Sequence, residues 1–117
     1  MTATLAPEIY NASTAEVVNC LIDFRGKLDV GELLTGTPTV TENNSPNHLS
    51  ISSKAVNSQT ITLSNGDTLA AGEAVTFRVT LSGATANTLY TITAVCGTTS
   101  TPAQTRDGAC RIYVTAA

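Results

Sequence analysis

The sequence predicts an all-β protein, an antiparallel β-sandwich of about seven strands. Apolar side chains recur at every second position between clusters of Gly, Asn, Asp and Pro, which is the pattern of half-buried strands joined by turns. Thr, Val and Ile are abundant and favour strands, and no segment has the pattern of an amphipathic helix. At 117 residues the chain has the size of one domain with a single core.

The first strand is expected in EVVNCLIDF, residues 16–24. Alternation gives this strand two largely apolar faces. One face carries Val18, Cys20, Ile22 and Phe24, and the other carries Val17, Asn19, Leu21 and Asp23.

Six further strands are expected at 37–42, 49–53, 60–63, 74–82, 88–96 and 109–115. The segments between them, NNSPN, SNGD and SGATAN, contain residues that tolerate turn geometry. In SNGD, Asn65 and Gly66 favour a hairpin turn. In the 74–82 strand the expected inward set is Val75, Phe77, Val79 and Leu81, so Arg78 should face water.

Short strands joined by turns favour two antiparallel sheets packed face to face, and a small closed barrel is the alternative. Tyr90 follows a turn and opens the next-to-last strand. In an immunoglobulin-like sandwich a Tyr at this position caps a sheet corner with its hydroxyl. Trp is absent, and the cysteines are not placed as the antibody pair, so the term immunoglobulin-like describes architecture alone.

Charge and hydropathy exclude two classes of partner. Only 13% of residues are charged and the net charge is −3, so the chain lacks the basic stripe of a nucleic-acid-binding protein. The apolar runs are far shorter than a membrane span, and the first residues lack the features of a signal peptide. We therefore expect no nucleic acid, no membrane, and synthesis in a cytoplasm.

Residues that could carry chemistry are few, and each is expected to be structural. His48 is the only histidine and lies in a polar loop, where an exposed position is expected. Asp23, Asp29 and Glu32 alternate with basic residues in what should be a solvated turn, which argues against a calcium site. No serine lies in a nucleophile elbow. We expect no enzyme, no metal and no cofactor.

The three cysteines, Cys20, Cys96 and Cys110, leave two alternatives open. If the last two strands end at 96 and begin again at 109, Cys96 and Cys110 both point inward at the mouth of one hairpin. They would then be a candidate disulfide. The alternative, buried reduced thiols that act as small apolar groups, is favoured by cytoplasmic synthesis.

Residues 1–14 are expected to form an N-terminal arm that precedes the sandwich domain of residues 15–117. The segment contains Pro7 and apolar side chains with little to pair them locally. Leu5, Ile9 and Tyr10 are therefore the candidate partner-binding residues, because aliphatic and aromatic anchors commonly supply affinity at protein interfaces.

Two stretches carry a resemblance to a family. LIDFRGKLDVGELLTGTPTV (21–40) contains an Asp-aromatic pair, Asp23-Phe24, and a Leu-rich turn that ends at Gly36. The segment 71–114 contains a turn with Gly83 and the strand YTITAV (90–95) before a final hairpin. In this order the motifs resemble the small immunoglobulin-like structural proteins of tailed bacteriophages, including capsid decoration or cement proteins.

The resemblance implies a function and a location but no catalytic residue. A decoration protein binds the outer surface of the capsid shell and stabilises it, with the major capsid protein and neighbouring copies of itself as partners. The implied state is a homo-oligomer on the virion, made in the cytoplasm of the bacterial host. The alternative is a neck, tail or fibre module that contacts other virion proteins or the host surface.

Overall fold

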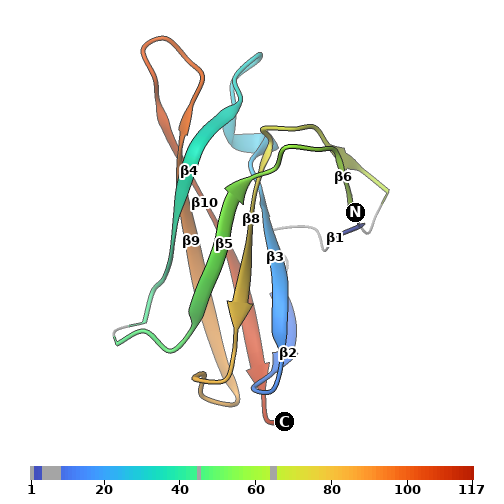
Figure 1. The fold of residues 1–117 in the computed structure, drawn as a ribbon, viewed down its shortest axis with the longest axis vertical. Coiled ribbons are helices and arrows are strands. Elements are labelled where there is room, and N and C mark those ends of the chain that lie inside the picture. The colour runs from blue at the N-terminus through green and yellow to red at the C-terminus, as the bar shows by residue number, and fades with distance from the viewer. Residues whose placement is uncertain (1, 4–8, 45, 64–65) are drawn as a thin grey trace.

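The computed structural model describes residues 2–3, 9–44, 46–63 and 66–117. Two sheets pack face to face, one of four strands in the order β2-β10-β9-β4 and one of three in the order β3-β8-β5. Figure 1 shows the long strands of both sheets running along the same axis of the molecule, with a small third sheet, β1-β6-β7, at one side. The predicted all-β antiparallel sandwich is confirmed.

All seven predicted strands are present, and three short strands are added to them. The predicted strands correspond to β3 Val17–Asp23, β4 Leu34–Glu42, β5 Ser50–Val56, β6 Ile61–Leu63, β8 Ala74–Thr80, β9 Thr88–Thr98 and β10 Thr105–Thr115. The added strands are β1 Thr2–Ala3, β2 Ile9–Ser13 and β7 Thr68–Leu69. One 3₁₀ turn, η1 Arg25–Lys27, follows β3.

Strand β2 pairs in parallel with the last strand, from Ile9 beside Arg111 to Ser13 beside Thr115. Residues 9–13 were expected in an arm outside the sandwich, whereas the structure places them in the four-stranded sheet. A five-residue strand whose partner lies about a hundred positions further along the chain leaves no local signal, because parallel pairs are not joined by a hairpin turn. Leu5 lies outside the described residues.

The main core is built from alternate side chains of the two facing sheets. As predicted, Val75, Phe77, Val79 and Leu81 are buried and Arg78 is exposed. Gly108 of β10 lies where the sheets approach closely, since an added Cβ would be 2.8 Å from Ile22 Cγ2 and 3.2 Å from Phe24 Cζ. The missing side chain at Gly108 makes room for the Phe24 ring, which is completely buried.

A second apolar cluster explains the two apolar faces of β3. The small sheet covers the outer side of β3 and β8, where Leu21 packs among buried side chains, namely Ile61, Leu63, Leu69 and Ala74. Strands β6 and β7 pair antiparallel, as the predicted hairpin requires, although Asn65 of the turn lies outside the described residues. Leu21 therefore belongs to a different cluster from Ile22, although the two residues are adjacent in the sequence.

The edge strands β4 and β5 carry features that discourage pairing with other chains. Pro38 lies within β4, and the register of β4 with β9 shifts between Thr35 and Thr39. The register of β5 with β8 shifts between Ser52 and Ala55, where Ser53 has a φ of 54°. Proline, bulges and exposed lysine are recurring ways of protecting a sheet edge, and Lys54 of β5 is exposed.

Asn57 is a buried polar side chain that joins β5 to the segment before β8. Its Nδ2 donates to the carbonyls of Gln59 and Ala70, each at 2.9 Å. Its Oδ1 accepts from the amides of Gly72 at 3.1 Å and Ala74 at 3.0 Å. The amide group thus supplies hydrogen bonds to backbone groups before β6, after β7 and at the start of β8.

Substitution Asn57→Ala should lower the free energy of unfolding by about 2 kcal/mol or more, since each buried group left unpaired costs roughly 1–3 kcal/mol. Urea unfolding followed by circular dichroism measures this loss. The neighbouring Ser58→Ala, at an exposed position, is the matched control and should change stability by less than about 0.5 kcal/mol. Equal losses in the two variants would contradict the role given to Asn57.

Candidate functional site

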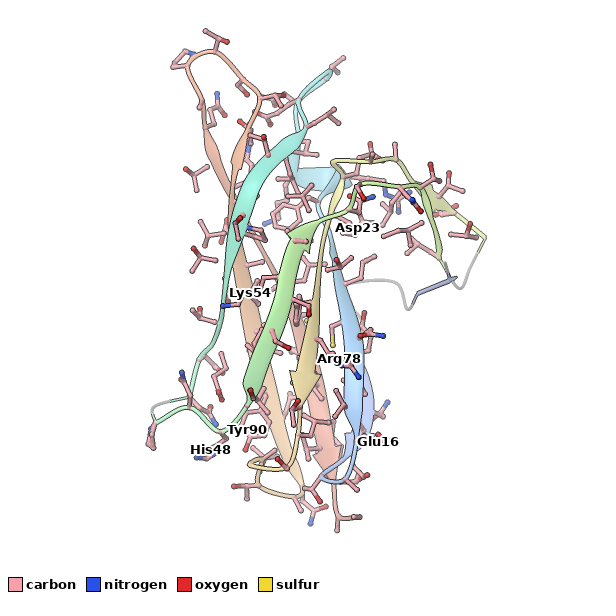
Figure 2. All side chains as sticks on the ribbon, in the orientation of Figure 1. Glu16, Asp23, His48, Lys54, Arg78 and Tyr90 are labelled. Carbon is pink, nitrogen blue, oxygen red and sulfur yellow. The ribbon has the colours of Figure 1, made fainter. Side chains whose placement is uncertain are left out.

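Tyr90 of β9 has the corner-capping role that its position in the sequence suggested. The side chain is completely buried, and its hydroxyl accepts a hydrogen bond from the Thr85 amide at 2.8 Å. The same hydroxyl lies 2.8 Å from His48 Nδ1. One oxygen atom therefore joins the turn before β9 to the loop between β4 and β5, at the end of the sandwich where Figure 2 shows both residues.

The prediction that His48 is an exposed loop residue is wrong, because the ring is half-buried and packs edge-on against Tyr90. The Tyr90 oxygen accepts from Thr85, so its proton can be donated to His48 Nδ1 when the imidazole is neutral and carries its hydrogen on Nε2. This arrangement satisfies both groups. The histidine therefore acts as a structural partner of Tyr90.

The carboxylates of the η1 region form two separate ion-pair groups. Asp23 accepts from Arg25, whose Nη2 and Nε lie 2.8 Å and 3.0 Å from Oδ2. Arg25 also reaches the Thr68 carbonyl, which connects η1 to the small sheet. In the second group, Asp29 and Glu32 both form ion pairs with Arg106 of β10. The three carboxylates are therefore not gathered around one position.

Glu32 is the more buried member of the second group, with 7% of its surface exposed. Its carboxylate accepts from the Ser100 hydroxyl, from the Asp29 amide at 3.1 Å and from Arg106 Nε at 3.1 Å. The Ser100 hydrogen bond, followed by that of the Asp29 amide, lowers the pKa of the Glu32 carboxyl to about 2. Glu32 thereby ties the loop before β4 to the β9–β10 hairpin.

The candidate disulfide between Cys96 and Cys110 is ruled out by the register of the last two strands. Cys96 lies opposite Arg106 and Cys110 lies opposite Ile92. The two cysteines are thus separated by four residues along the sheet, or roughly 13 Å at about 3.3 Å per residue. This alternative fails because both strands extend beyond 96 and 109, so the hairpin loop is shorter than expected. The favoured alternative, buried reduced thiols, is confirmed.

All three cysteines are free and buried. Cys110 lies near enough to Cys20 of the opposite sheet for the two thiols to interact electrostatically. Burial, followed by the nearby Cys110, raises the pKa of the Cys20 thiol well above its usual range. Burial also raises the pKa of Cys110 to about 12 and that of Cys96 in the same direction. These thiols act as small apolar core groups, because little reactive thiolate forms at neutral pH.

Tyr10 is engaged within the chain. Its hydroxyl accepts from the Leu21 amide at 2.9 Å and donates to the Leu21 carbonyl at 3.3 Å, and the half-buried ring packs against the main core. These bonds attach β2 to β3, which is an edge strand of the opposite sheet. A substitution of Tyr10 would therefore disturb the fold as well as any interface. Ile9, the other candidate anchor within the described residues, lies in β2.

A hollow between β4 and β5 contains a polar group that sequence reasoning missed. It has a volume of about 150 Å³, with walls formed by Val40, Leu49 and Ile51 and polar groups from Thr41, Asn47 and Lys54. Glu42 also lines it, with only 8% of its surface exposed. Its Oε1 accepts from the Leu49 amide at 2.7 Å, whereas Oε2 is buried without a hydrogen-bond partner.

A signal for Glu42 was present in the sequence. The alternation that places Val40 on the inner face of the 37–42 strand also places Glu42 there, at the end of the strand. An acidic side chain on the inner face of an edge strand is costly to bury unless it is paired, so the alternation alone marks this residue as unusual.

Two further properties bear on function. Among the described residues, no group of three or more His, Cys, Asp or Glu side chains is placed to hold a metal ion. In the same part of the chain, no helix has the length and apolar character needed to cross a membrane.

Comparisons with models of known protein families, with curated proteins and with solved structures found no match.

Tyr90→Phe should lower the free energy of unfolding by about 1–2 kcal/mol, because the Thr85 amide and His48 Nδ1 both lose their partner in a partly buried place. Chemical denaturation measures the loss. Tyr113→Phe, on the outer face of β10, is the matched control and should cost less. If both variants unfold at the same denaturant concentration, the hydroxyl of Tyr90 does not anchor this corner.

The lowered pKa of Glu32 predicts how acid affects stability. A carboxyl whose pKa is lower in the folded protein stabilises the fold above its unfolded pKa, near 4.5, and this contribution disappears as the pH falls towards about 2. The difference in melting temperature between the wild type and Glu32→Gln should therefore be large at neutral pH and shrink between about pH 4.5 and 2. A difference that stays constant over this range would contradict the assignment.

Proposed function

We propose that this protein is a virion structural protein of a tailed bacteriophage, a decoration protein that binds the outer surface of the capsid shell and stabilises it. Two observations support this proposal. The order of motifs from Asp23-Phe24 to YTITAV resembles that of phage structural proteins, and the all-β sandwich is compatible with such a protein. The partners would be the major capsid protein and neighbouring copies of the chain. The protein would be made in the host cytoplasm and would have no enzymatic activity.

The structural observation that carries this proposal is an uncharged part of the outer face of the four-stranded sheet, on β4 and β9. Charges begin on the neighbouring β10, where Asp107 lies opposite Val95 and Arg111 opposite Thr91. We call the outward side chains of β4 and β9 the threonine face. It comprises Thr35, Thr37, Thr39 and Thr41 of β4 together with Leu89, Thr91, Thr93 and Val95 of β9. Leu89 and Val95 are 44% and 39% exposed, so the face offers apolar area as well as hydroxyl groups.

Such a face suits broad contact with a rigid protein surface. Threonine and valine side chains have few rotamers to lose, so ordering them at an interface costs little conformational entropy. Contact through the threonine face would rely on shape and hydrogen bonding, since β4 and β9 present no charge there. The polar side chains that look equipped for chemistry, such as His48 and Glu32, are instead committed to bonds within the fold.

The immunoglobulin-like form of the sandwich is part of the same proposal. The Tyr90 hydroxyl bonded to the Thr85 amide, five residues upstream, supports it. The pairing of the first strand of the four-stranded sheet with the last strand, β10, is also compatible with it.

The number of copies per particle tests the location. Quantitative gel analysis of purified virions should give a copy number of the same order as that of the major capsid protein. A few copies per virion would contradict a shell location and favour a neck, tail or fibre.

The salt dependence of binding tests the kind of contact. Occupancy on stripped capsids should change little between about 0.1 M and 1 M salt, although the Debye length falls from about 10 Å to about 3 Å, because the threonine face has no charges to be screened. Occupancy that collapses as the salt rises would indicate a contact driven by charge.

Two matched variants test the face itself. Thr39→Glu places a charge in the middle of the threonine face and should reduce occupancy on stripped capsids at least tenfold. Ser52→Glu places the same charge at an exposed hydroxyl position on β5, in the other sheet, and should leave occupancy unchanged. Equal occupancy of the two variants would exclude the threonine face as the contact surface.

A further inference from the structure

The hollow between β4 and β5 has a feature that the rest of the fold does not explain. In the described part of the chain, Glu42 Oε2 is the one buried side-chain nitrogen or oxygen atom without a hydrogen-bond partner. Buried polar groups in folded proteins are nearly always paired, and an unpaired carboxylate oxygen is among the costliest exceptions. The oxygen belongs to a side chain that lines a hollow large enough for a small group.

We propose that this hollow binds an alkylammonium group, the chemical group at the end of a lysine side chain, with Glu42 Oε2 as its acceptor. The source in a complex would be a lysine of a partner protein. Binding of an ammonium group to the hollow does not depend on a location of the protein on a virion.

The walls of the hollow match a cation carried on an aliphatic stem. Val40, Leu49 and Ile51 provide apolar contact for methylene groups, and Glu42 provides the charge. Asn47 also lines the hollow and carries a side-chain oxygen that can accept a further hydrogen of an ammonium group. A volume of about 150 Å³ corresponds to roughly five water molecules at about 30 Å³ each, which is enough for a short alkylamine.

The hydrogen bonds of Glu42 favour an ammonium group over other cations. Oε1 is already occupied by the Leu49 amide, so the carboxylate has one free oxygen. A guanidinium group binds best to two oxygens at once through its planar fork, whereas an ammonium group needs only one. A calcium ion takes six to eight oxygen ligands, and this hollow contains a single carboxylate.

Lys54 also lines the hollow. Figure 2 shows this side chain extending from β5 towards β4, and Lys54 is exposed. Within the described residues, neither Lys54 nor Glu42 forms an ion pair. The positive charge of Lys54 would compete with an incoming ammonium group. Removal of that charge should therefore leave binding intact or make it tighter.

The test is a titration of the ¹⁵N-labelled full chain with n-butylammonium chloride, followed by NMR at constant ionic strength. The amide signals of Asn47 and Leu49 should shift and saturate. The neutral isostere 1-butanol should produce no saturable shift of these signals. Glu42→Gln keeps an acceptor for the Leu49 amide but removes the charge, and should weaken binding at least tenfold.

Several outcomes would overturn the proposal. They are the absence of saturation with butylammonium in the wild type, equal binding of 1-butanol, and unchanged affinity in Glu42→Gln. The first two use the wild type and do not depend on how the variant folds. Tighter binding of n-propylguanidinium would overturn the choice of an ammonium group. Loss of binding in Lys54→Met would show that the site is not the one built around Glu42.

Discussion

The close approach of β10 to β3 at Gly108 is the contact on which the arrangement of the two sheets depends. A side chain at this position would collide with Ile22 and crowd the Phe24 ring, which fills the space that glycine leaves. Phe24 is also the last residue before η1, and its amide bonds to the Glu73 carbonyl. The position of β10 over β3 therefore fixes Phe24, where the chain leaves the three-stranded sheet. It also fixes the start of η1, which contacts the small third sheet through Arg25.

Buried polar groups fall into two classes in this structure. Asn57, Tyr90 and Glu32 each join segments that the sheets leave unconnected, and each is satisfied by backbone or side-chain partners. Their contribution is to fix loops and turns. Glu42 differs, because one oxygen fixes the β4–β5 loop through Leu49 while the other has no hydrogen-bond partner among the described residues. A group of this kind is more easily explained by recognition than by stability.

The sequence predicted the strands because side-chain alternation is local, and burial of Val75, Phe77, Val79 and Leu81 follows directly from it. The role of Tyr90 was also accessible, since it depends on a turn five residues away. Properties that depend on register or on distant pairing were not accessible. The separation of Cys96 from Cys110 required the length of the hairpin loop, and the place of β2 required a partner at the other end of the sheet. The half-buried state of His48 likewise depends on Tyr90, 42 residues away.

The parallel pairing of β2 with β10 has a consequence for how the chain folds during synthesis. Strands β3, β5 and β8 can pair once residue 80 has been made, but their inner face is covered only when β9 and β10 are complete at residue 115. At about 5–20 residues per second, a ribosome needs roughly 2–7 s for this interval. During that time the apolar side of the three-stranded sheet is uncovered, and β2, which was made early, still lacks its partner β10. The nascent chain is then most exposed to association with its neighbours, and rapid release of the final strand ends this vulnerable period.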